Sequence, residues 1–121
     1  MEEYELLKSL RIGNYIRSKS DKKYYKIVRL DIENDINITA EPIPLTEEIL
    51  LKFGFYKSEI SGEHFYFNPE LLIKVRIEDG YWEEPSLDVF LGLNYITCIE
   101  FVHELQNLIF ALTKEELKIN L

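Results

Sequence analysis

The clearest hydrophobic period in this chain lies near its C-terminus. Across residues 97–113, apolar side chains recur at spacings of three and four residues, as they do on one face of an α-helix. Glu100, Glu104, Gln106 and Asn107 lie mostly off this stripe, and Thr97 with Glu100 has the spacing of a helix capping box. The pattern therefore predicts one long helix over 97–113 with a buried face formed by Cys98, Phe101, Val102, Leu105, Leu108, Ile109 and Leu112.

The N-terminal part alternates apolar and polar residues over short stretches separated by turn residues. This alternation predicts a hairpin formed by strands over 10–17 and 24–33, followed by a third strand over 36–43. Three consecutive short strands with tight turns indicate a β-meander or half of an SH3-like barrel.

The central part begins with a short helix and then returns to β structure. Thr46 is suited to cap the helix N-terminus, Glu47 and Glu48 complement its dipole, and Gly54 supplies a left-handed stop. Further strands are predicted over 55–57, 63–68, 71–78 and 87–95. We therefore expect an α+β fold with short antiparallel strands, a short central helix and a C-terminal helix packed on sheet.

Composition limits the class of protein. The 121 residues are 46% hydrophobic, which suffices for one core and predicts a single domain over 1–121. No apolar run approaches the roughly 18 residues that span a bilayer, and the first residues lack a signal-peptide pattern, so we expect a cytoplasmic protein. The lone Cys98 falls on the predicted helix stripe, which favours a buried, unreactive thiol.

Residues for catalysis or metal binding do not form recognised constellations. His103-Glu104 begins a zinc-protease helix signature, but Asn107 stands where the second histidine is needed. Cys98 and His103 are five residues apart, the wrong spacing for neighbours on a helix. We therefore predict no catalytic residues, no metal and no cofactor, and a protein that is not an enzyme.

One candidate surface is a basic segment with interleaved tyrosines. Residues 8–29 contain eight bases and one acid, although the whole chain has a formal net charge of -8. Bases can contact phosphates while aromatic rings stack on unpaired bases, so this segment is a candidate nucleic-acid site. Its proposed contacts are Arg17, Lys19, Lys22, Lys23, Tyr24 and Lys26. The alternative is a solubilised turn beside an exposed strand edge, with one ring of the Tyr24-Tyr25 pair turned into the core.

The second candidate surface is the acidic connection over 78–88, which surrounds the only tryptophan with five acids and no base. Trp and Tyr are frequent interface anchors, and an acidic rim favours a basic partner such as a nucleic-acid-binding protein. The predicted partner contacts are Glu78, Asp79, Tyr81, Trp82, Glu83 and Glu84. The alternative places Trp82 in the core.

Three segments carry a family resemblance. They are residues 10–16, 43–55 and 101–117, the last containing VHELQNLIFALTKEEL. Together they resemble a recurrent group of uncharacterised small proteins from bacteriophages and prophages. The group supplies no activity and no functional residue to transfer; its usual members have Gly where Lys114 stands here, and a shorter, less basic first turn.

The resemblance implies a biological setting. Small phage proteins that lack catalytic residues often block a host machine, so the leading hypothesis is an inhibitor of a host defence nuclease, such as an anti-CRISPR protein. Its partner would be a host nucleic-acid-binding protein such as a CRISPR effector, with possible RNA contact, no membrane contact, and a monomer rather than an oligomer. The alternative is a structural or accessory phage protein that self-associates.

Overall fold

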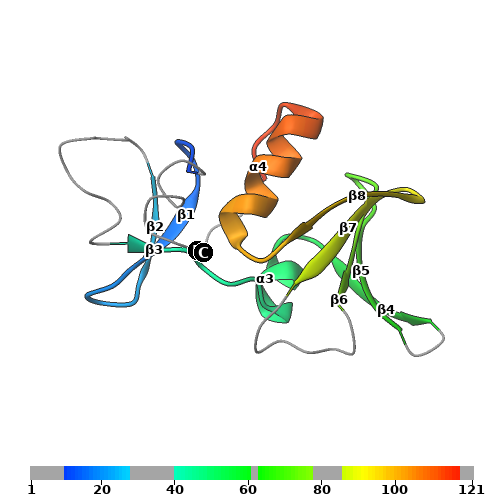
Figure 1. Cartoon of the computed structure of the whole chain (residues 1–121), viewed down its shortest axis with the longest axis horizontal. Helices are drawn as coiled ribbons and strands as arrows, with labels where there is room; N and C mark the ends of the chain where they lie inside the picture. Colours follow the sequence, from blue (N-terminus) through cyan, green and yellow to red (C-terminus); the bar gives the residue numbers. More distant parts are fainter. Residues whose placement is uncertain (1–9, 28–39, 61–62, 78–85, 118–121) are drawn as a thin grey trace. The chain divides into compact units, whose positions relative to one another are not determined.

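The computed structural model describes residues 10–27, 40–60, 63–77 and 86–117. They belong to two compact units (Figure 1). Unit 1 combines the chain up to Ile43 with Phe101–Glu116, and unit 2 contains Pro44–Glu100. Among the described residues, each unit has its own antiparallel sheet and one helix, which confirms the predicted α+β class. That the two units form a single domain stays a prediction.

Unit 1 contains a small sheet and the C-terminal helix. Its strands are β1 (Tyr15–Ser18), β2 (Tyr24–Lys26) and β3 (Ala40–Glu41), in the order β2-β1-β3, and helix α4 (Val102–Thr113) packs against β1. The predicted hairpin is therefore present but shorter than expected, and its third strand pairs with β1. The described strands form an open sheet with β1 at its centre, whereas the meander lies in unit 2. Residues 28–39, which carry parts of two predicted strands, lie outside the described residues.

Polar side chains join α4 to the turn that precedes β1. The side-chain amide of Gln106 accepts a hydrogen bond from the Tyr15 amide at 2.8 Å and donates one to the Gly13 carbonyl at 3.1 Å. Asn14 donates to the Asn107 side chain at 2.8 Å, and the Arg11 Nε donates to the same oxygen at 3.2 Å. We call this set of contacts the polar seam. Gln106 is buried, so the expectation that it lies off the packed face is wrong; its amide satisfies backbone groups that α4 and the turn bury between them.

Arg11 connects the polar seam to Glu116, which lies just after α4. It pairs with the carboxylate of Glu116 and lies over the Phe110 ring at 4.2 Å from the centroid. The hydrogen bond from Arg11 holds the pKa of Glu116 below its usual value. Gly13 has a positive φ of 99°, and an added Cβ there would lie 3.2 Å from this carboxylate. The left-handed φ therefore favours glycine, and a Cβ here would also crowd the Glu116 carboxylate slightly.

His103 is fully buried on α4. Burial disfavours the charged imidazolium and lowers the pKa of His103 to about 4. Its ring stacks on Phe101 at a centroid distance of 5.9 Å. His103 is therefore a neutral core residue at pH 7.

The start of α4 corrects the predicted helix boundary. Thr97 and Cys98 belong to strand β8 (Asn94–Ile99) of unit 2, and α4 begins only at Val102. Strand pairing wins because Thr97 lies opposite Val89 and Cys98 opposite Asp88. The capping interaction is made by Glu104, whose carboxylate accepts from the Phe101 amide at 3.0 Å.

Unit 2 begins with a capped helix. Helix α3 (Glu47–Lys52) starts as predicted: the Thr46 hydroxyl accepts from the Ile49 amide at 3.2 Å, and Gly54 follows the helix with φ 84°. Ile49 and Leu50 are its buried residues. The predicted central helix is confirmed.

The sheet of unit 2 is a five-stranded antiparallel meander (Figure 1). Its strands are β4 (Tyr56–Ile60), β5 (Glu63–Asn68), β6 (Ile73–Ile77), β7 (Leu87–Leu91) and β8. The predicted single strand over 87–95 is wrong, because the chain turns at Gly92, with φ 61°, and returns as β8.

One face of this meander is the core of unit 2. Alternate residues of β6 and β7 are buried, and they align with Tyr66 on β5 and Ile99 on β8; the buried β6 and β7 residues are Ile73, Val75, Ile77, Leu87 and Val89. Lys57 shares the side of Tyr66 and pairs with Glu47 of α3 at 3.5 Å. Helix α3 therefore lies on the core side, and the opposite face carries the intervening residues.

Candidate functional site

The predicted basic surface is the β1–β2 hairpin of unit 1, which we call the basic hairpin (residues 15–26). Strand β2 is at the sheet edge, with Arg17 opposite Tyr24 and Ile16 opposite Tyr25. The structure brings the predicted contacts together on one hairpin: Arg17, Lys19, Lys22, Lys23, Tyr24 and Lys26.

Acidic neighbours compensate part of this charge. Glu41 on β3 accepts from Arg17 at 2.7 Å and from Lys22 at 3.0 Å. These bonds, led by that from Lys22, lower the pKa of Glu41, so its carboxylate is charged at pH 7. Asp21 lies in the turn and accepts from the Lys23 amide at 2.9 Å. The hairpin is therefore a mixed-charge surface, because Glu41 comes from a strand that the segment count did not include.

Both tyrosines of β2 are exposed. Tyr24 is 39% and Tyr25 48% exposed, so the expectation that one ring of the pair enters the core is wrong. The reason is that β2 is a three-residue edge strand with neither side covered. The Tyr25 hydroxyl donates to Asp21, which ties that ring to the turn. Tyr24, Lys23 and Lys26 remain on the surface of the hairpin.

The second predicted surface lies outside the described residues. This applies to Glu78, Asp79, Tyr81, Trp82, Glu83 and Glu84. Asp88, at the end of the same acidic connection, is part of β7.

The structure reveals another surface, which the sequence did not predict. On the face of the unit 2 meander opposite its core, two cross-strand rows run over all five strands. The first row is Tyr56, Phe67, Lys74, Phe90 and Tyr95. The second row is Ser58, Phe65, Arg76, Asp88 and Cys98. We call these two rows the aromatic face.

The inner rings of this face hold its cations. The Lys74 ammonium lies 4.7 Å from the Phe65 ring centroid and 5.0 Å from that of Phe90. The Arg76 guanidinium lies 5.5 Å from the Phe90 centroid and pairs with Asp88 at 2.7 Å. No carboxylate of the described residues pairs with Lys74. Cation–π contacts therefore fix two positive charges on the open sheet.

The outer rings are more open to solvent. Tyr56 is 68%, Tyr95 56% and Phe67 37% exposed. The Tyr95 ring meets Phe90 edge-on, at a centroid distance of 5.7 Å and an interplanar angle of 73°. The face thus places accessible rings beside cations that are already oriented.

Cys98 ends the second row and is exposed, so the prediction of a buried thiol is wrong. The error follows from the helix boundary, because Cys98 lies on a strand and on its solvent side. Its sulfur is 2.6 Å from the Ser86 hydroxyl.

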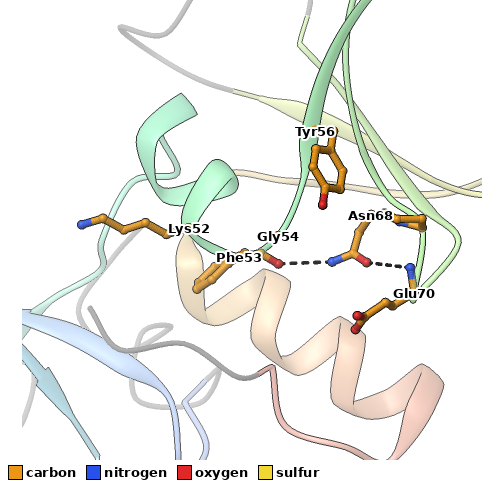
Figure 2. Close-up of a pocket in the computed structure, with 7 residues that line it drawn as sticks. Lys52, Phe53, Gly54, Tyr56, Asn68 and Glu70 are labelled. Atoms are coloured by element: carbon orange, nitrogen blue, oxygen red, sulfur yellow. Dashed lines mark hydrogen bonds between the residues drawn. The ribbon is translucent and has the colours of Figure 1, made fainter.

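A small hollow adjoins the aromatic face at Tyr56 (Figure 2). Its volume is about 230 Å³, and it lies between the end of α3 and the β5–β6 turn. The Asn68 amide donates to the Phe53 carbonyl at 3.2 Å and accepts from the Glu70 amide at 3.0 Å. These two bonds of Asn68 serve to join the helix end to the turn. We therefore regard the hollow as the border of the aromatic face and not as a separate site.

Sequence reasoning missed the aromatic face because its rows depend on register. The alternation of Phe65, Tyr66 and Phe67 does indicate two aromatic side chains on one side of a strand. Aligning them with Lys74 and Phe90 requires the pairing of β5, β6 and β7. A bulge between Val89 and Phe90 then sets Tyr95 in the row.

The chain matches no family model, no curated protein and no solved structure. Within the described ranges, no helix has the length and apolar character needed to cross a bilayer.

Proposed function

We propose that this chain acts by binding rather than by catalysis, and that it inhibits a host defence nuclease as an anti-CRISPR-like protein of a phage or prophage. The aromatic face is the surface that would dock on the nucleic-acid-binding effector. The observation that carries the proposal is the pair of rows in which exposed rings flank Lys74 and Arg76.

The chemistry of this face supports docking. Exposed apolar rings lose unfavourable contact with water when a partner covers them, and Tyr and Arg are frequent anchors of binding energy. Cation–π contacts already restrain Lys74 and Arg76, which reduces the entropy lost on binding. The basic hairpin is the second candidate: Glu41 pairs with two of its predicted contacts, as Asp88 pairs with Arg76, but the hairpin lacks the rows of exposed rings.

The test is an affinity pull-down of the tagged protein from host lysate that contains its native defence systems, with and without nuclease treatment. A double variant, Tyr56→Thr with Tyr95→Thr, removes two exposed rings from positions where threonine suits a strand. Leu51→Gln is the matched control, because Leu51 is an exposed apolar residue of α3. We expect one stoichiometric effector with the natural chain and the control, at least tenfold less with the double variant, and loss of nuclease inhibition in parallel.

Two results would contradict the proposal. Equal capture by the double variant would remove the aromatic face as the docking surface. Recovery of only the chain itself or of virion proteins, together with a mass that rises with concentration in light scattering, would favour the self-associating structural protein.

A further inference from the structure

The aromatic face differs in charge from the unit that carries it. Pro44–Glu100 contains eleven acidic and four basic residues. The two rows contain two of those bases and only one acid, Asp88, which is paired with Arg76. Within the two rows, bases therefore outnumber acids, which suits an anionic ligand better than the composition of the unit as a whole does.

The rings and cations divide into two groups. Phe65 and Phe90 lie under Lys74 and Arg76 and hold these cations in place. Phe67 and Tyr95 lie on either side in the first row, three strands apart, which is about 15 Å at the usual strand spacing. Open rings therefore flank a central positive strip.

We propose that the aromatic face binds a single strand of nucleic acid, with bases stacked on Phe67 and Tyr95 and phosphates near Lys74 and Arg76. This inference rests on the proposed function: it names the single-stranded nucleic acid held by the effector, rather than the effector protein itself, as what the aromatic face contacts. Every base has a π-face, so stacking on such rings tolerates many sequences, and the cations supply the contact with the backbone. A duplex hides its base faces and cannot make the stacking contacts.

Fluorescence anisotropy of the purified full chain tests the inference directly. The probes are labelled oligouridine and oligodeoxythymidine of about ten nucleotides, with a duplex of equal length for comparison. Two phosphate contacts predict that log affinity falls with log salt at a slope of about −1.4, and the duplex should bind at least tenfold more weakly. Equal affinity for RNA and DNA would show that the shared bases and phosphates are recognised, and a preference for either identifies the natural source.

Variants assign the binding to individual groups. Tyr95→Ser should lower affinity about tenfold, since it removes one stacking ring. Lys74→Gln should reduce the salt slope by about 0.7. Lys57→Gln is the matched control: it removes a lysine of the same sheet from the core side, and the salt slope should stay unchanged. Circular dichroism of each variant verifies that unit 2 is folded.

Several outcomes would overturn the inference. They are no anisotropy change at low salt, equal binding of duplex and single strand, or loss of binding with Lys23→Gln and Lys26→Gln but not with Lys74→Gln, which would place the ligand on the basic hairpin. An effector captured through the face after nuclease treatment, with no oligonucleotide binding, would leave the proposed function standing and make the ligand a protein. Oligonucleotide binding without effector capture would support the nucleic-acid ligand and contradict the proposed function.

Discussion

The two sheets of this protein are held by different kinds of contact. In unit 1, Gln106 and Asn107 of α4 accept hydrogen bonds from the Tyr15 amide and the Asn14 side chain, and Glu41 pairs with bases of the hairpin. In unit 2, five strands bury a regular apolar face, and the other face carries rings and cations. Unit 1 therefore uses these polar groups to join its helix and strands, whereas unit 2 carries rings and cations on the sheet face opposite its core.

This comparison explains why charge alone is a poor guide to a binding surface. The basic hairpin has many cations, but those nearest β3 are paired with Glu41. The aromatic face has two, which lie over rings, and Asp88 pairs with one of them, Arg76. The relevant quantity is the number of cations that are not already paired with a carboxylate of the same fold.

The largest expected effect breaks the polar seam. Gln106→Met keeps the side-chain length but removes the bonds to the Tyr15 amide and the Gly13 carbonyl. Two orphaned backbone groups should lower the stability of unit 1 by about 4 kcal/mol. Hydrogen exchange should show lost protection at the Tyr15 amide while amides of β5 and β6 stay protected; equal loss in both sheets would contradict the comparison. Leu112→Gln on the exposed side of α4 is the control, with a change under about 0.5 kcal/mol.

A second prediction uses pH. The unfolded chain protonates His103 near pH 6.5, whereas the folded pKa is about 4, so the unfolded state binds more protons between these values. Stability should fall by about 3 kcal/mol as pH drops from 6.5 to 4. Urea titrations across this range measure the slope. The pKa values of Glu41 and Glu116 are lowered in the folded state. The stability that these two carboxylates contribute is therefore lost at lower pH, when they become protonated.

Substitution of His103 tests the source of this slope. His103→Leu should flatten it, because the side chain that takes up the proton on unfolding is gone. A slope that persists in His103→Leu would show that another group causes it.

A third prediction concerns a left-handed backbone conformation that occurs once after α4 in unit 1 and once before β6 in unit 2. Lys114 after α4 and Leu72 before β6 have left-handed φ values of 61° and 57°. Glycine accepts this conformation without a Cβ penalty, so Lys114→Gly and Leu72→Gly should each stabilise its own unit by about 1 kcal/mol. Thermal unfolding measures the gain. Lys114→Ala retains a Cβ and should give no comparable rise; an equal rise would mean that strain is not the cause.

The smallest expected effect concerns the basic hairpin. Glu41→Gln releases Arg17 and Lys22 and should cost less than about 1 kcal/mol of stability, because the pairs are partly exposed. Oligouridine affinity should rise only about twofold, since exposed charges are screened by salt. Anisotropy at two salt concentrations measures this. A much larger increase would make the hairpin the main nucleic-acid surface.

Much of the fold was predictable because local signals and tertiary structure agree. Thr46 caps α3 as expected, and alternation predicted β5 and β6. The error at Thr97 arose because the helical spacing of Cys98 and Phe101 competed with a strand whose partner, β7, cannot be identified from local sequence. Long-range pairing decided the outcome.

The candidate site was less predictable than the fold. Local sequence revealed the cations of the hairpin but not Glu41, which reaches Arg17 from 24 residues away. The aromatic face required the register of five strands, and a shift of one residue would turn its rings into the core. Its exposed side chains therefore depend on the pairing of their buried neighbours.

The chain's single cysteine gives the aromatic face a native chemical reporter. Cys98 is exposed at the end of the second row, opposite Asp88. Its alkylation rate can be followed in the natural sequence without an engineered label, and a ligand covering the row would slow it. The same thiol can carry a fluorophore or a photo-crosslinker, so an unknown occupant of this face can be trapped covalently before it is identified.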